Sequence, residues 1–132
     1  MSEENVEIVR RGFIALMEDD WPTALSTLHA DIEVHDFDIP DAGVYRGHDG
    51  FREWLSNWGE SWDEWWVDDV EFRAGSNSQV IALFKIVTRG KESGIEINRD
   101  DAIVYRLDAG KIVRAEYFNR QDAALEAAGL SE

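Results

Sequence analysis

The chain has 132 residues with 28 acidic and 13 basic side chains, and its net charge of -15 would repel nucleic-acid phosphates and anionic membranes. We therefore expect neither a nucleic-acid partner nor a membrane partner. The absence of cysteine excludes disulfides, thiolate catalysis and cysteine-ligated metals. The chain contains neither an apolar run long enough to span a membrane nor a basic segment followed by an apolar one, so we expect it to be soluble and cytoplasmic. Its length suits a single domain over residues 1–132.

The first half of the chain is predicted to hold three helices. Apolar residues from Val6 to Leu16 recur at helical spacing and predict a helix over residues 3–17. Pro22 suits the first turn of a second, short helix that forms a hairpin with the first. Asp49 can cap a third helix, whose apolar stripe consists of Phe51, Trp54, Leu55, Trp58 and Trp62.

A period of two predicts strands in much of the remaining chain. Residues 31–37 alternate and predict a first strand, followed by a loop over residues 38–47. From residue 65 onward the period of two persists, and it predicts strands over 65–74, 80–89, 95–107 and 111–118 before a short helix at 122–128. The fold class is therefore α+β, with a curved antiparallel sheet covered by the three early helices.

The stretch from Ile95 to Leu107 departs from its own pattern. Its odd positions form the predicted core face, yet Arg99 and Asp101 stand in the middle of that apolar series. An ion in a core is costly unless another group pairs with it. Such a break in pattern usually marks a functional or strained place.

Strand pairing predicts what surrounds these two charges. A three-residue loop over residues 108–110 predicts four cross-strand pairs: Leu107 with Lys111, Ile103 with Ala115, Asp101 with Tyr117, and Arg99 with Asn119. Pairing Gly90 with Ile95 on the preceding hairpin places Phe84 opposite Asp101. The charges should therefore lie among apolar and aromatic side chains.

A small polar cluster on a concave apolar face is the usual description of a small-molecule site. Asp36 and Asp101 are the candidate proton acceptors, and Arg99 and Tyr117 are candidates for polarising a ligand oxygen. The candidate ligand contacts are Phe13, Trp54, Trp58, Trp62, Phe84, Ile103 and Asn119.

Each of these signals has a plainer interpretation. The tryptophan stripe also suits an ordinary core, and Arg99 with Asp101 could be a structural ion pair. Asn119 could serve only as the N-cap of the last helix. The three histidines share neither a helical face nor a metal-ligand spacing, so we expect no metal.

Two segments carry a resemblance to a known family: YRGHDGFREWL at Tyr45 to Leu55, and GKIVR at Gly110 to Arg114. With the helices and four long strands around them, they resemble the SnoaL-like polyketide cyclases of the nuclear-transport-factor-2-like superfamily, which includes ketosteroid isomerases and limonene epoxide hydrolases. The resemblance covers nearly the whole chain. It implies a cone-shaped α+β barrel with a deep pocket and a homodimer formed through the outer sheet face.

The catalytic residues of the known relatives match this sequence only in part when they are compared one position at a time. Asp36 falls where the isomerases keep their catalytic base. Their oxyanion tyrosine would fall at Gly12, and their second acid falls near Ile103. The three catalytic positions of the epoxide hydrolases fall at Phe84, Ile86 and Tyr117. Neither of these two activities is therefore implied for this chain.

Three hypotheses follow for the function. The leading one is a cofactor-free isomerase or cyclase that binds an apolar, ring-containing carbonyl compound, with Asp36 or Asp101 as the base. The alternative is a non-catalytic protein that binds a carboxylate-bearing metabolite through Arg99. The third is a dimerising scaffold whose aromatic side chains fill the core entirely.

Overall fold

The computed structural model describes residues 2–38, 43–60, 64–90 and 93–130. Its helices are α1 (Ser2–Met17), α2 (Trp21–Ser26), α3 (Gly47–Glu60) and α4 (Gln121–Ala127). Its strands are β1 (Leu28–Asp36), β2 (Val44–Arg46), β3 (Glu64–Ala74), β4 (Gln79–Arg89), β5 (Glu96–Asp108) and β6 (Lys111–Phe118). The short strand β2 lies in a stretch that the sequence predicted to be loop.

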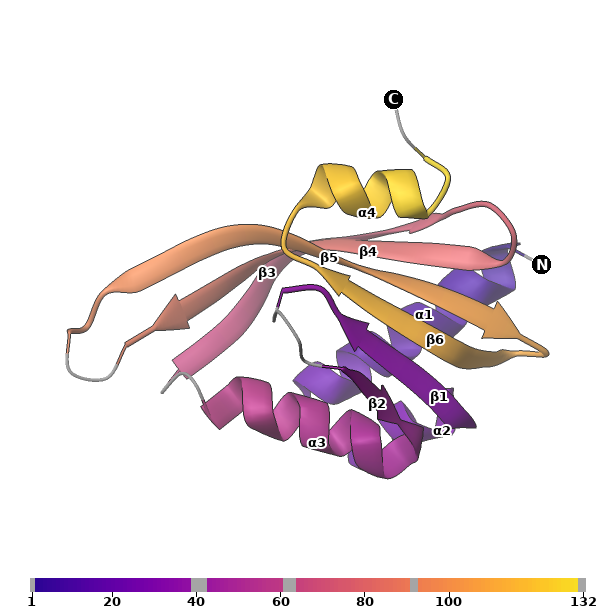
Figure 1. Ribbon diagram of the computed structural model, residues 1–132, viewed down its shortest axis with the longest axis horizontal. Helices are drawn as coiled ribbons and strands as arrows, with labels where there is room; N and C mark the ends of the chain where they lie inside the picture. The colour runs from indigo at the N-terminus through magenta and orange to yellow at the C-terminus, as the bar shows by residue number, and fades with distance from the viewer. Residues whose placement is uncertain (1, 39–42, 61–63, 91–92, 131–132) are drawn as a thin grey trace.

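The strands form one curved, unclosed sheet of six strands in the order β2-β1-β6-β5-β4-β3 (Figure 1). Every neighbouring pair is antiparallel except β1 with β6, which run parallel. The prediction of an antiparallel sheet was therefore wrong at one pair. These two strands can run parallel because most of the chain lies between them and supplies the long connection that a parallel pair needs.

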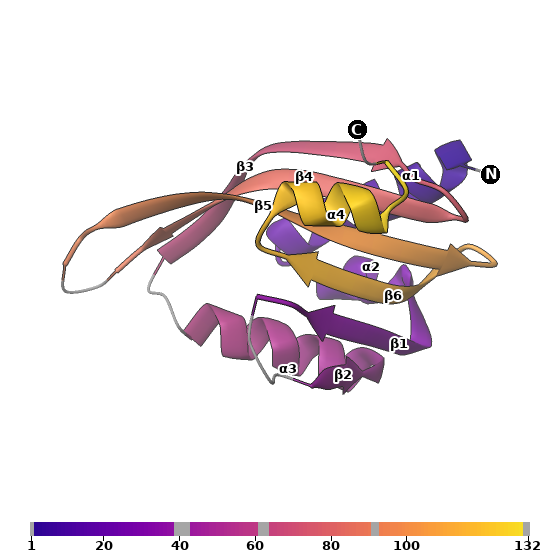
Figure 2. The same ribbon diagram turned by 45° about the horizontal axis from the view of Figure 1, so that its top comes forward.

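The helices cover the two faces of the sheet unequally. α1, α2 and α3 lie on the concave face, and α4 lies on the opposite, outer face (Figures 1 and 2). The main core on the concave side takes alternate strand residues, among them Val80, Ala82, Phe84, Ile103 and Tyr105. A smaller cluster beneath α4 takes the intervening ones: Ile81, Leu83, Ala102 and Val104. The predicted α+β class is confirmed.

The β5–β6 hairpin closes differently from the prediction. Ala109 and Gly110 have φ of 50° and 80°, so the loop is a two-residue turn of the type that suits twisted hairpins. An extra residue in β6 then shifts the pairing, so that Ile103 lies opposite Tyr117 and Tyr105 opposite Ala115. Three of the predicted pairs, those of Leu107, Ile103 and Asp101, were therefore wrong by one or two residues, and the fourth lies beyond the paired part of the hairpin. Between residues 102 and 106 the pairing is shifted by two residues. Because two is an even number, the β5 and β6 side chains that were predicted to face inward still do so.

The pairing of β4 with β5 agrees with the prediction, and Phe84 lies opposite Asp101. The far end of this hairpin differs, because Ile95 and Ile97 are 61% and 49% exposed although the pattern placed them on the core face. Figures 1 and 2 show that the end of the hairpin extends beyond the helices. None of the helices in the described ranges covers these two side chains.

A β-bulge interrupts β3. Asp68 pairs with Lys85 and Glu71 with Leu83, so β3 holds one residue more than β4 over this interval. Asp69, inside the bulge, has φ of 54°. The extra residue reverses the alternation of faces, which explains why Trp65 and Phe72, one odd and one even, both pack against the main core.

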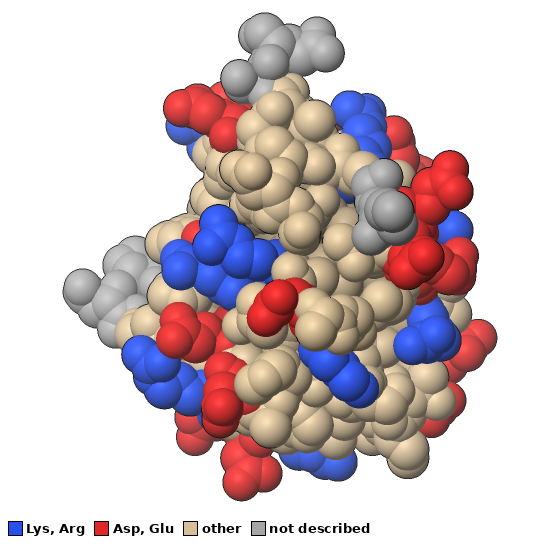
Figure 3. All heavy atoms as spheres, turned by 90° about the vertical axis from the view of Figure 1, so that its right-hand side faces the viewer, with Lys and Arg blue, Asp and Glu red and all other residues tan. Residues whose placement is uncertain are grey.

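The surface carries charges of both signs. Figure 3 shows acidic and basic side chains interspersed over one face of the molecule. Within the described part of the chain, no helix is both long and apolar enough to cross a membrane.

Candidate functional site

An ion pair between a half-buried arginine and a fully buried aspartate lies at the centre of the sheet. Arg99 and Asp101 are neighbours on the inner face of β5, and the Asp101 side chain is 0% exposed. Arg99 Nε donates to Asp101 Oδ1 at 2.7 Å, and Arg99 Nη2 donates to Asp101 Oδ2 at 2.8 Å. This two-pronged geometry matches the planar guanidinium to the carboxylate and compensates for the loss of hydration.

Tyr117 completes the coordination of Asp101. Its hydroxyl donates a short hydrogen bond to Asp101 Oδ2. Burial raises the pKa of Tyr117, and the negative charge of Asp101 raises it further. The phenol therefore keeps its proton, and in the ligand-free site that proton is directed at Asp101.

Arg99 also reaches a second carboxylate, which sequence reasoning missed. Arg99 Nη2 donates to Asp38 Oδ2 at 3.0 Å, and Asn119 Nδ2 donates to Asp38 Oδ1 at 3.0 Å. The hydrogen bonds from Arg99 to Asp101, and then to Asp38, raise the pKa of Arg99 despite its partial burial. Asp38 lies in the turn just after β1, where no period of the sequence pattern indicates the direction of its side chain.

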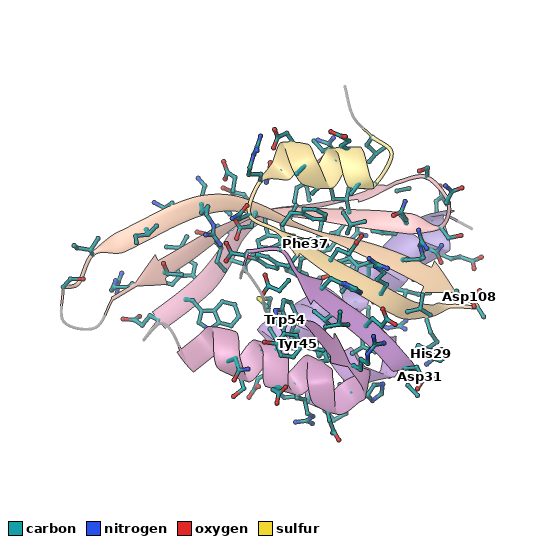
Figure 4. All side chains as sticks on the ribbon, viewed as in Figure 1. His29, Asp31, Phe37, Tyr45, Trp54 and Asp108 are labelled. Atoms are coloured by element: carbon teal, nitrogen blue, oxygen red, sulfur yellow. The ribbon has the colours of Figure 1, made fainter. Side chains whose placement is uncertain are left out.

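Asp36 connects the sheet to helix α3. It is 5% exposed. Its Oδ2 accepts a hydrogen bond from Trp54 Nε1 at 2.7 Å, and its Oδ1 accepts one from the backbone N of Asp38 at 2.9 Å. Figure 4 shows Trp54 between α3 and β1. Asp36 on β1 lies beside Tyr117 on the parallel strand β6. The two predicted proton acceptors, Asp36 on β1 and Asp101 on β5, therefore lie on either side of β6.

An apolar pocket lies beside this polar cluster, between the sheet and helices α1 and α3. Its volume is about 50 Å³. Aliphatic side chains and seven aromatic ones line it, the latter being Phe13, Phe51, Trp54, Trp65, Phe84, Tyr105 and Tyr117. A water occupies at least about 10–15 Å³ on this scale, so the pocket holds a few small atoms and a ring enters only if side chains move.

Some of the predicted site residues line this pocket, and others do not. Tyr117 is the one predicted catalytic residue that lines the pocket, and Asp36, Arg99 and Asp101 do not. Of the predicted ligand contacts, four line it: Phe13, Trp54, Phe84 and Ile103. Asn119 is exposed and holds Asp38 instead. Trp62 and the side chain of Trp58 lie outside what the structure describes.

Tyr105 is a pocket residue that sequence reasoning assigned only to the core. It is 8% exposed, and its hydroxyl donates to no described residue. Burial raises its pKa. Tyr105 also lines a smaller cavity of about 20 Å³, beside Gly12 and Thr27. Tyr105 therefore adds a second phenol to the pocket wall.

Among the described residues, no three His, Cys, Asp or Glu side chains converge in a way that could hold a metal ion. The polar cluster is instead built from hydrogen bonds between Arg99 and carboxylates.

A family model described as a SnoaL-like domain matches residues 9–115. The chain belongs to this SnoaL-like family. Among the curated proteins, no sequence matches the chain significantly. The matched span of this SnoaL-like chain runs from α1 into β6 and so includes both the ion pair and most of the pocket wall.

Solved structures similar to this SnoaL-like protein share its fold at low identity. An NTF2-like protein from Burkholderia thailandensis is 26% identical with a TM-score of 0.75, over 93% of this chain and 95% of its own. An NTF2-like protein of unknown function from Burkholderia pseudomallei is 20% identical with a TM-score of 0.75, over 95% and 97%. TerC, crystallised with polyporic acid, is 19% identical with a TM-score of 0.74, over 95% and 97%.

We predict that Asp101→Asn destabilises this SnoaL-like protein by about 2–4 kcal/mol, because Arg99 and Tyr117 lose a shared buried anion. The value lies below the usual range for a fully buried pair since the Arg99 side chain is 40% exposed. Urea unfolding measures it. Asp100→Asn, at the exposed neighbouring position, is the matched control and should change stability by less than about 0.5 kcal/mol. An Asp101→Asn loss no larger than the control would contradict a structural role for the pair.

We also predict that alkaline pH destabilises the protein through its buried phenols. The pKa of Tyr117 and that of Tyr105 are raised on folding, so their contribution to stability is complete below about pH 10, where an unfolded tyrosine ionises, and is lost as the pH rises further. The free energy of unfolding should therefore fall between about pH 9.5 and 11. Urea titrations across this range measure it, and Tyr117→Phe should flatten the slope. An unchanged slope in that variant would count against the effect of Tyr117.

Proposed function

We propose that this SnoaL-like protein binds a small, apolar, ring-containing carbonyl compound and acts on it as a cofactor-free isomerase or cyclase. The observation that supports this proposal most directly is Tyr117, which lines an apolar pocket while its hydroxyl is held by the buried Asp101, itself paired with Arg99. When its hydroxyl turns from Asp101 toward the pocket, this phenol provides a polar point on an apolar wall. Such a point can orient a ligand oxygen.

In the proposed reaction a carboxylate removes a proton from the carbon next to the carbonyl. The C–H electrons form an enolate, and its oxygen accepts a hydrogen bond from Tyr117, which turns from Asp101 toward the ligand. Asp101 remains paired with Arg99 during this step, so its charge stays compensated. The proton then returns from the carboxylic acid to another carbon, which completes an isomerisation.

Asp36 is the better candidate for the base. Asp101 already accepts three hydrogen bonds from Arg99 and Tyr117, so both of its oxygens are occupied and point away from the pocket. One oxygen of Asp36 accepts a hydrogen bond from an indole and the other accepts one from a backbone amide. It also lies directly behind Trp54, a residue of the pocket wall, so a rotation of that indole would expose the carboxylate to the ligand.

Non-catalytic binding is the second candidate, because neither Asp36 nor Asp101 lines the pocket in this structure. In that case the apolar part of the ligand would fill the pocket, and Arg99 would not be its partner. A ligand carboxylate at Arg99 would have to displace Asp38 or Asp101, both of which already bind it.

Proton exchange on a cyclic ketone separates the two candidates. We expect the protein to accelerate replacement of the α-protons of 2-tetralone by deuterium in heavy water, followed by proton NMR. Asp36→Asn should lower that acceleration by about 10²–10⁴-fold. Asp31→Asn, at an exposed position on the same strand, is the matched control and should leave it intact. Exchange no faster than in buffer, with tetralone bound, would reject the catalytic proposal in favour of binding alone.

We further propose a homodimer formed through the outer sheet face beyond α4. Phe37 and Val44 are 54% and 38% exposed, and Phe37 lies at the end of β1 with its ring 5.1 Å from that of Phe118 (Figure 4). Light scattering should give about twice the mass of one chain, and Phe37→Glu should give about one. A wild-type mass of one chain at tens of micromolar protein would contradict the dimer.

A further inference from the structure

A groove adjoins the apolar pocket at its outer end. We call it the vestibule, and it is lined by Leu16, Asp19, Trp21, Arg52, Leu55, Ser56 and Trp65. Its volume is about 360 Å³. The vestibule and the pocket share Leu16, Leu55 and Trp65, so the two spaces meet at these three side chains. Unlike the pocket, the vestibule is of the size that organic ligands usually occupy.

Arg52 gives the vestibule a cation that no carboxylate neutralises among the described residues. Its guanidinium lies 4.7 Å from the centre of the Trp21 ring. Seven other arginines do pair with acids in the described part of the chain: Arg10, Arg46, Arg73, Arg89, Arg99, Arg114 and Arg120. In a chain with a net charge of -15, an arginine left without an acid beside a groove is well suited to an anionic group from outside.

The turn between α1 and α2 holds Trp21 in place. Asp19 has φ of 61°, a conformation that is unfavourable for a residue with a side chain. Its Oδ1 accepts a hydrogen bond from Trp21 Nε1 at 3.0 Å, and the Trp21 ring meets Phe51 edge-on at 6.4 Å. Asp19 is the one acid in the vestibule wall. Since the guanidinium stacks on a fixed ring, its N–H groups are oriented before a ligand arrives.

We propose that the vestibule binds the anionic group of an amphipathic ligand, a carboxylate or sulfonate, through Arg52. The ring of the ligand lies between Trp21 and Trp65, and its apolar end enters the pocket. This inference rests on the proposed pocket function and names the class of ligand. It moves the predicted carboxylate contact from Arg99, which Asp38 and Asp101 occupy, to Arg52.

Two fluorescent probes that differ by one sulfonate test the proposal. 1-Anilinonaphthalene-8-sulfonate carries the anionic group, and N-phenyl-1-naphthylamine has the same rings without it. We expect the wild-type protein to bind both. Arg52→Gln should weaken binding of the sulfonate about tenfold and leave the neutral probe unchanged, because only the charged hydrogen bonds are lost. Arg52→Lys, which keeps the charge, should restore part of the difference.

Arg106→Gln is the matched control, because Arg106 is exposed on β5 and lies outside the vestibule wall. It should change the affinity for neither probe. Arg52→Gln weakening both probes equally would mean that Arg52 only supports Trp21, and an unchanged sulfonate affinity would mean that it makes no contact. Either result overturns the anion site while the pocket proposal stands. Failure of the wild-type protein to bind the neutral probe would reject the pocket and the vestibule proposal together.

Discussion

The structure depends on the burial of one carboxylate, that of Asp101. An anion with no exposed surface is stable only where donors surround it, and here they come from Arg99 on the same strand and Tyr117 on the next. Arg99 in turn holds Asp38 just beyond β1. Three strands are thus fixed to one another at the point where the sheet faces the pocket, so the polar cluster sets the position of the pocket's tyrosine.

Polar and apolar functions are separated by two aromatic residues. Trp54 and Tyr117 each present a ring to the pocket and a polar hydrogen to a carboxylate behind it. Their rings lie 6.0 Å apart in an edge-on arrangement. Because each is amphipathic, the wall can remain apolar toward a ligand while the charges lie one layer deeper. A change in either ring's orientation would therefore expose a charge to the ligand.

The sequence predicted the class of fold and the place of the charge cluster, since both depend on periodicity and on a break in it. It did not predict the register of the last hairpin, because the turn has two residues rather than three and an extra residue in β6 moves the core face from Ile112 to Ala115 and Tyr117. Asp38 and Tyr105 were missed because a loop acid and a core tyrosine are ordinary in isolation. Arg52 was missed for a related reason: its importance depends on which acids fail to reach it.

The bulge at Asp69 has a consequence for how such a pocket can diversify. Because the extra residue decides that Trp65 and Val67 rather than Trp66 face the concave side, the length of β3 controls which side chains form this wall. Loss of a single residue there would exchange one face of the strand's first half for the other. In a lineage built on this sheet, an insertion or deletion outside the polar cluster could remodel ligand preference in one event and leave every hydrogen bond of Asp101 in place.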